Sequence, residues 1–193
     1  MNIFLFIFGF MLLESQAQVL KNSVFSPIEK DAYDPDMVCP KMWVFYGTSC
    51  YRFFRSPIKT RNEARQYCRQ YNSDLASLNS MEENSFLTTY LQSNDPSHRI
   101  WYISGRQVNP GNWKNDGDGT TMINLDSAFL PNQDTSADAN FLAYGYSLSA
   151  RQWGLLRVDG LDPMLYICEI LASQVLFQFN IIFSPKLKYI LPP

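Results

Sequence analysis

The chain has 193 residues, of which 46% are hydrophobic and 18% are charged, and its formal net charge is −2. This composition excludes a disordered polar chain and a collagen-like repeat, and it lacks the basic excess typical of nucleic-acid binding. One histidine and four cysteines offer too few ligands for a zinc cluster and little for histidine-based catalysis. We therefore expect one domain of ordinary size, with no catalytic residue, no metal, no cofactor and no nucleic-acid partner.

The amino-terminal segment resembles a secretory signal. Residues 3–13 are apolar, a run too short for a membrane-spanning helix, which needs about 20 residues. Small residues at Ser15 and Ala17 follow in the spacing of a cleavage site. We predict a signal peptide at 1–17 and hence an extracellular protein, secreted or associated with the cell surface. Residues 18–38 contain prolines and clustered aspartates, which predict an extended acidic leader.

The four cysteines predict two disulfides, because thiols oxidise in the secretory pathway. Four cysteines allow three pairings. Cys39 and Cys50 flank a strand-and-turn pattern at 43–49, and a hairpin there brings the two together. Cys68 then pairs with Cys168. The loop closed by that bond is about one hundred residues long, for which the chain-entropy estimate is about 4.7 kcal/mol.

Two capping boxes predict two helices. Thr60 and Glu63 begin the first, which we expect over residues 60–71 with Ala64, Tyr67, Cys68 and Tyr71 on one face. Ser80 and Glu83 begin the second. Its predicted buried residues are Phe86, Leu87, Tyr90 and Leu91.

Strand patterns occur at 74–78, 100–103, 141–146, 153–158 and 164–169. Residues 105–140 are rich in Gly, Asn and Asp, and we expect a long loop there. This order of elements predicts an α+β domain. Residues 171–183 are apolar but interrupted by polar side chains, so we expect no transmembrane segment, and 171–193 form a tail of unknown structure.

Several short motifs, taken in order, resemble the C-type lectin-like domain over residues 39–170. They are Cys39-Pro40 with Trp43, Cys50-Tyr51-Arg52-Phe53, Ala64 with Cys68, Asp74-Leu75-Ala76-Ser77-Leu78, Trp101-Tyr102-Ile103-Ser104-Gly105, Pro131-Asn132, Trp153, and Tyr166-Ile167-Cys168-Glu169. The resemblance implies an α+β fold with two helices, antiparallel sheets and a long irregular loop, closed by disulfides.

A narrower resemblance concerns residues 51–65, 101–102 and 126–132. These segments resemble the lectin module of arthropod contactins, which are cell-surface adhesion proteins of septate junctions. This resemblance implies that the chain acts in cell adhesion or junction assembly through contacts with cell-surface or extracellular proteins.

The chain departs from the family at the positions used for sugar binding. The resemblance implies that calcium-dependent members present a Glu-Pro-Asn or Gln-Pro-Asp triplet and then Trp-Asn-Asp, since Ca²⁺ takes about six to eight oxygen ligands. Here Leu130 precedes Pro131-Asn132, and Gly154-Leu155 follow Trp153. We therefore expect no calcium-dependent sugar binding at this site. The residues that we take as ligand-contact candidates are Pro131, Asn132, Gln133 and Trp153. The alternative is a soluble lectin that recognises glycans or microbial surfaces.

Two local patterns have simple interpretations. Residues 115–119 resemble the start of a calcium loop, but no acidic residue closes it at the twelfth position, so we predict a turn. His98 has no nucleophile motif beside it, and we predict a surface residue.

Charge is unevenly distributed along the sequence. Six basic residues lie between Arg52 and Arg69, and five acidic residues lie between Asn115 and Asp138. These groups either form opposite poles that orient a charged partner or a second copy, or they are two solvated faces.

Overall fold

The computed structural model describes residues 39–122, 125–131 and 136–175. The described elements are, in chain order, β1 (Val44–Tyr46), β2 (Ser49–Lys59), α2 (Arg61–Arg69), β3 (Asp74–Leu75), α3 (Met81–Asn94), β4 (Trp101–Asn109), β5 (Asn112–Asn115), β6 (Thr121–Met122), the 3₁₀ turn η1 (Asp126–Ala128), β7 (Phe141–Ser147), β8 (Gln152–Val158) and β9 (Met164–Leu171). A further helical turn begins at Ala172. The predicted α+β class is confirmed.

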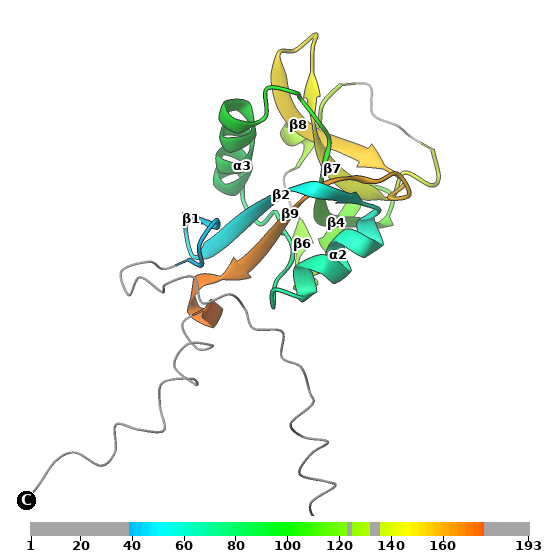
Figure 1. Cartoon of the computed structure of the whole chain (residues 1–193). Helices are drawn as coiled ribbons and strands as arrows, with labels where there is room; N and C mark the ends of the chain where they lie inside the picture. Colours follow the sequence, from blue (N-terminus) through cyan, green and yellow to red (C-terminus); the bar gives the residue numbers. More distant parts are fainter. Residues whose placement is uncertain (1–38, 123–124, 132–135, 176–193) are drawn as a thin grey trace, which may run out of the picture. The chain divides into compact units, whose positions relative to one another are not determined.

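The strands form a single mixed sheet. β2 and β9 run antiparallel through the middle of the domain, with α2 and α3 on either side of the pair (Figure 1). From β9 the sheet continues through β4 to β5 and β6, while β7 pairs with both β4 and β8. The β4–β9 pair is parallel, whereas we expected only antiparallel pairs. The parallel pair arises because the long crossover between the two strands brings the chain back in the same direction.

Both predicted capping boxes are present. At the start of α2 the Thr60 amide donates to the Glu63 carboxylate at 3.0 Å. At the start of α3 the Glu83 amide donates to Ser80 Oγ at 3.1 Å, while the Glu83 carboxylate turns back to the Asn79 amide. α2 ends at Arg69, so Tyr71, predicted on its buried face, lies beyond the helix and is 37% exposed.

The two predicted disulfides, Cys39–Cys50 and Cys68–Cys168, are both formed. Cys39–Cys50 packs with Ile170, Ala172 and Val175 next to the β1–β2 hairpin. Cys68–Cys168 joins α2 to β9 and lies in a second buried cluster with Tyr102 and Tyr166. The bond therefore ties the two ends of the domain together, as the spacing predicts.

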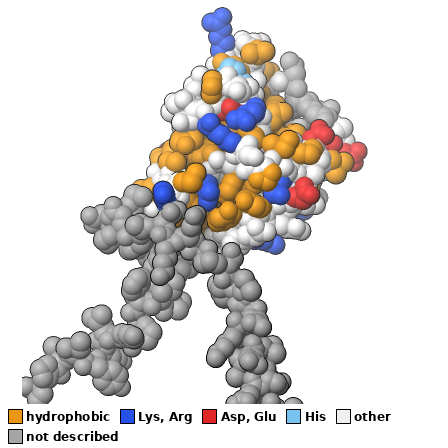
Figure 2. All heavy atoms as spheres, in the orientation of Figure 1, with side chains coloured by type: hydrophobic (Ala, Val, Ile, Leu, Met, Phe, Trp, Pro, Cys, Tyr) orange, Lys and Arg blue, Asp and Glu red, His pale blue; other side chains and the backbone are white. Residues whose placement is uncertain are grey.

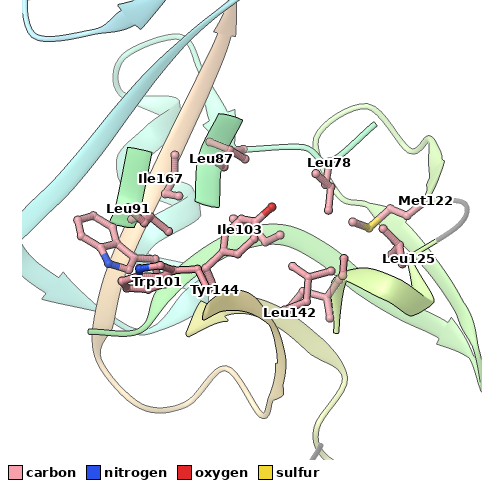
Figure 3. Close-up of a cluster of buried hydrophobic side chains, with 14 of the residues drawn as sticks. Leu78, Leu87, Leu91, Trp101, Ile103, Met122, Leu125, Leu142, Tyr144 and Ile167 are labelled. Carbon is pink, nitrogen blue, oxygen red and sulfur yellow. The ribbon is translucent and has the colours of Figure 1, made fainter. Parts of the chain in front are cut away.

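The main core lies between the sheet and α3. Its labelled members in Figure 3 come from α3, β4, β6, β7, β9 and the segments at Leu78 and Leu125, and the largest rings and side chains among them include Trp101, Ile103 and Tyr144. Each of these three side chains is fully buried. Trp101 Nε1 donates to Asp95 at 2.8 Å, and Tyr144 OH donates to Asn84 at 2.9 Å. These bonds satisfy polar groups that burial would otherwise leave unpaired.

The prediction of one long loop over 105–140 is wrong in its first part. β4 continues to Asn109, turns at Gly111 with a φ of 77°, and returns as β5. Trp113 on β5 is buried, and packing of this ring stabilises the hairpin. Gly, Pro and Asn at 109–112 are typical of a tight hairpin turn as much as of an irregular loop.

Candidate functional site

The segment before Pro131 packs directly on β8. The Leu130 amide donates to the Leu155 carbonyl at 3.0 Å, and Phe129 forms an isolated parallel bridge with Leu155. Leu130 is 5% exposed and Leu155 is fully buried. These two residues occupy positions where the family resemblance implies oxygen ligands for calcium. In this chain both positions are occupied by buried leucine side chains, which have no oxygen atoms to offer.

Gly154 makes this close approach possible. A Cβ atom at this position would lie 2.8 Å from the Ala128 carbonyl oxygen and 2.8 Å from Leu130 Cδ2. Any larger residue there would push the 128–130 segment away from β8. The asparagine that the family triplet has at this position therefore does not fit this backbone.

The predicted ligand-contact residues fall in different environments. Pro131 is exposed, Trp153 is only 6% exposed, and Asn132 and Gln133 lie outside the described residues. Within the described part of the chain, the buried Trp153 Nε1 has no hydrogen-bond partner. Ligand contact at these four residues stays a prediction.

A second exposed feature surrounds the turn between β7 and β8. His98 is exposed, as predicted, and its ring stacks on Tyr146 with centroids 3.7 Å apart. Leu148, in the turn, is 80% exposed, and Arg151 beside it is exposed as well. We call His98, Tyr146, Leu148 and Arg151 the hairpin surface. An exposed leucine two residues along the chain from a stacked aromatic ring is suited to contact with another protein.

A groove of about 580 Å³ follows the outer side of α3. Tyr46 stacks on Phe86 at 4.2 Å, and Phe53 stacks on Tyr90 at 4.0 Å. Phe86 and Tyr90 were expected in the core, but they are partly exposed and line this groove with serine and threonine side chains. The expectation failed for these two because the β1–β2 hairpin covers only part of that helix face.

A smaller groove of about 490 Å³ lies beside the β4–β5 turn. Its polar lining includes Gln107, Asn109, Asn140 and Arg157. Arg157 Nε donates to the Ala139 carbonyl at 3.1 Å, and its terminal nitrogen donates to Gln107 at 3.2 Å. Amide and guanidinium groups of this kind bind hydroxyl-rich or anionic molecules.

The hypothesis of separate charge poles is wrong at Asp116. This carboxylate accepts from buried Arg61 at 2.9 Å and from Arg106 at 2.8 Å, and Arg65 lies 3.7 Å away. Arg65 also pairs with Asp74 at 2.9 Å. In this cluster acidic and basic groups thus neutralise one another. Figure 2 shows basic side chains dispersed among hydrophobic ones over the face that it presents.

Electrostatics in this cluster favours the ionised forms. Burial alone would raise the pKa of Asp116, but the hydrogen bond from Arg106 and the charge of Arg61 outweigh it and lower that pKa. Burial lowers the pKa of Arg61, against the attraction of Asp116. Arg61 nevertheless remains a cation at physiological pH, since an arginine does not deprotonate in proteins. The cluster is therefore a structural ion-pair network between α2 and the turn after β5.

The 115–119 segment forms the predicted turn. Asn115 is fully buried, and its side-chain oxygen accepts from the Leu78 amide and from Ser104 Oγ, each at 3.0 Å. Asp118 accepts from the Thr120 amide at 2.9 Å. Among the described residues, His, Cys, Asp and Glu nowhere gather in a group of three or more that could hold a metal ion.

The family model described as the Lectin C-type domain matches residues 58–170. The chain belongs to the C-type lectin domain family. It is 38% identical over 101 residues to contactin of Drosophila melanogaster, covering 52% of this chain and 7% of that protein. It is also 38% identical over 73 residues to C-type lectin domain family 12 member B of Bos taurus, covering 33% of this chain and 26% of the relative. The chain thus spans about a quarter or less of these relatives.

Solved structures share the fold. The C-type lectin domain of murine dendritic cell inhibitory receptor 2 in complex with N-glycan superposes with a TM-score of 0.61 at 17% identity, covering 69% of this chain and 98% of that one. The Ca²⁺-independent C-type lectin SPL-2 from Saxidomus purpuratus gives a TM-score of 0.52 at 20% identity, covering 68% and 93%. The predicted C-type lectin-like fold is confirmed.

Domains of this family are in general binding modules, and the relatives are mostly proteins of the cell surface or extracellular space. In the described ranges, no helix has both the length and the apolar character required to cross a bilayer.

Proposed function

We propose that this chain is an extracellular, non-enzymatic recognition module that acts in cell adhesion or junction assembly by binding proteins. The burial of leucine side chains at positions 130 and 155 carries the proposal. Calcium requires several oxygen ligands, and two buried leucine side chains supply none. The hairpin surface offers aromatic, aliphatic and basic side chains for contact with a protein instead.

Similarity to Drosophila contactin supports the adhesion role. It covers 52% of this chain and 7% of that protein, so the role in adhesion, and in septate junctions as the sequence resemblance implies, comes to this chain as a proposal. The same proposal assigns residues 1–17 to a signal peptide, 18–38 to an acidic leader, 39–170 to the lectin-like domain and 171–193 to a tail. The partners are cell-surface or extracellular proteins.

The hairpin surface is the contact region that we favour. Leu148 is 80% exposed, and a partner could cover it together with the stacked rings of His98 and Tyr146. At the opposite end of β8, Leu161 is 73% exposed but follows Asp159 and precedes Asp162. These two leucines provide a matched pair for mutation.

The test uses beads coated with the full chain and cells that bind them. We expect binding to be abolished when the cells are treated with protease, and to be unchanged by glycosidases or by a calcium chelator. Leu148→Glu should reduce binding at least about tenfold, the loss typical of an anchor residue, while Leu161→Glu leaves it unchanged. Binding that glycosidase or chelator abolishes would contradict the proposal.

The polar groove near Arg157 favours a second candidate, a soluble lectin that binds glycans or microbial surfaces without calcium. Gln107, Asn109 and Asn140 present amide groups suited to sugar hydroxyls. A glycan array probed with and without chelator separates the candidates. Glycan binding that persists in chelator and is lost in Asn109→Ala would support the lectin function over the protein-binding one.

A further inference from the structure

Two cations of β2 lie over aromatic rings and not beside carboxylates. The Arg52 guanidinium is 4.5 Å from the centroid of the Phe54 ring and 5.0 Å from that of the Tyr71 ring. The Lys59 ammonium is 5.1 Å from the centroid of the Tyr67 ring. Neither cation forms a salt bridge in the part of the chain that the structure describes. We call Arg52, Lys59, Tyr67 and Tyr71 the cationic face.

The three arginines of the neighbouring helix α2 differ, because each of them pairs with an aspartate. Arg65 and Arg69 both pair with Asp74, at 2.9 Å and 3.4 Å. Arg61 pairs with Asp116 at 2.9 Å. The charges of these three side chains are therefore balanced inside the domain. A cation that aromatic rings hold in place, with no acid beside it, keeps its charge and its N–H donors for a group from outside.

The acidic side chain that Lys59 influences is Glu63, which serves as the cap of α2. The Glu63 carboxylate accepts from the Thr60 amide at 3.0 Å and from Thr60 Oγ1 at 2.8 Å. These hydrogen bonds lower the pKa of Glu63, and the charge of Lys59 adds to their effect. No ion pair joins the two side chains, so the Lys59 ammonium is left with N–H donors for a further acid.

The phenols of the cationic face add a further donor. The Tyr67 and Tyr71 hydroxyls are 3.3 Å apart, and whichever of them donates uses one of their two hydrogens. The other hydrogen is not bound by any further group that the structure describes. The ring of Tyr166 lies edge-on to Tyr67, and its buried hydroxyl also has no hydrogen-bond partner there. This face therefore has more donors than acceptors, which is the composition of an anion site.

Apolar groups beside Arg52 indicate the class of anion. Met42 is 73% exposed, and its Sδ lies 3.9 Å from a terminal nitrogen of Arg52. Tyr71, on which the same guanidinium lies, is 37% exposed. A peptide presents carboxylates together with apolar side chains, so it can cover both kinds of group. A sulfated polysaccharide has no apolar side chains, and it requires a row of unpaired cations, whereas the arginines of α2 are paired.

We propose that the cationic face binds an acidic peptide segment of a partner protein. Arg52 and Lys59 each bind a carboxylate, and apolar side chains of the segment cover Met42 and Tyr71. This site rests on the proposed protein-binding function, and it adds a second contact surface to the hairpin surface. The formal net charge of the chain is −2, so attraction of an acidic segment depends on this local cluster and not on the charge of the whole chain.

The experiment measures binding of the full chain to a labelled probe peptide by fluorescence anisotropy. The probe has about 12 residues of glutamate, glycine and leucine, and a second peptide carries glutamine in place of every glutamate. We expect the glutamate peptide to bind at least about tenfold more tightly than the glutamine peptide in about 50 mM salt. The difference should shrink in about 500 mM salt, because salt screens the attraction between exposed charges.

Three variants locate the binding. Arg52→Gln and Lys59→Gln should each weaken binding of the glutamate peptide at least about threefold, and the two together at least about tenfold. Arg55→Gln is the matched control, because it removes one charge from the same strand, but Arg55 donates to the Asn94 carbonyl at the end of α3. This variant should bind the peptide as the natural chain does. Thermal unfolding of each variant shows whether its fold is kept.

Three results would overturn the peptide site. In the first, the natural chain binds both peptides alike. In the second, the folded double variant of Arg52 and Lys59 binds the glutamate peptide as tightly as the natural chain. In the third, a heparin hexasaccharide binds the face more tightly than the peptide, which would assign it to sulfated glycans. Leu148→Glu should keep peptide binding, so if only the peptide fails while cell binding still depends on Leu148, the cationic face alone is wrong.

Discussion

Two regions of this domain differ in how they relate to the family pattern. In the region around β2, β9 and α2, the Cys68–Cys168 bond and the capping box of α2 match the pattern of the C-type lectin-like domain. In the region where residues 128–130 meet β8, leucines and a glycine stand at ligand positions. The first region contains the framework of the fold, and the second lies where the family resemblance implies the ligand site.

At this place the structure holds residues 128–130 against β8 without oxygen ligands from the side chains at 130, 154 and 155. In the second region the contact that joins the loop to β8 is a backbone hydrogen bond covered by hydrocarbon. Burial of apolar surface does not require an ion, and it provides stability at any calcium concentration.

The largest change in the free energy of unfolding is expected when the Cys68–Cys168 disulfide of the first region is removed. Replacing Cys68 and Cys168 with alanine should reduce the free energy of unfolding by about 4 kcal/mol, because the bond closes a loop of about one hundred residues. The matched pair Cys39→Ala and Cys50→Ala, which opens a much shorter loop, should cost about 3 kcal/mol. Urea unfolding at one pH measures both. If removal of Cys39–Cys50 lowered the free energy of unfolding more than removal of Cys68–Cys168, the expectation that stabilisation grows with loop length would be contradicted.

In the second region, truncation of a buried leucine is expected to lower the free energy of unfolding by a slightly smaller amount. Leu155→Ala should reduce the free energy of unfolding by about 3 kcal/mol, because it removes a fully buried side chain and leaves a cavity in the main core, where Phe129 packs. Leu148→Ala, an equal deletion at an exposed position, should change it by less than about 0.5 kcal/mol. If both variants unfold alike, the leucine packing does not stabilise the loop.

A still smaller loss of stability is expected when acid protonates Asp116 in the ion-pair network. The pKa of Asp116 is lowered in the folded chain, so its contribution to stability is present above its ordinary pKa and is lost as pH falls below it. We expect a loss of about 1 kcal/mol between pH 4.5 and pH 2.5 that Asp116→Asn removes. Thermal unfolding across this range checks it, with Asp126→Asn as an exposed control. If Asp116→Asn lost as much stability as the natural chain between pH 4.5 and pH 2.5, other carboxyl groups would account for the loss.

Local sequence signals predicted the framework well. The capping residues Thr60 and Glu63 lie three positions apart, and the cysteine spacing of the β1–β2 hairpin is short, so both are visible in the sequence. The contacts that were missed join distant positions. Arg61 and Asp116 are 55 residues apart, and Tyr51 and Glu169 are 118 apart. No periodic or capping pattern marks such pairs, because tertiary folding alone brings them together.

The site could be predicted only in part. The sequence shows that Leu130, Gly154 and Leu155 lack ligand atoms, but not that Leu130 bonds to Leu155 or that Gly154 leaves room for Ala128. The β4–β5 hairpin was missed for another reason, since turn residues at 109–112 outweighed the strand pattern around them. Composition alone does not distinguish a loop from a hairpin when the strands are short and rich in polar residues.

The most direct test of the packed-leucine account is thermal unfolding of the full chain with about 10 mM Ca²⁺ and with chelator, a concentration above the range at which extracellular calcium modules bind. The natural chain and Asn132→Ala are compared under both conditions. We predict that calcium raises the Tm of the natural chain no more than it raises that of Asn132→Ala. A rise in Tm that occurs with calcium and disappears in Asn132→Ala would contradict the account.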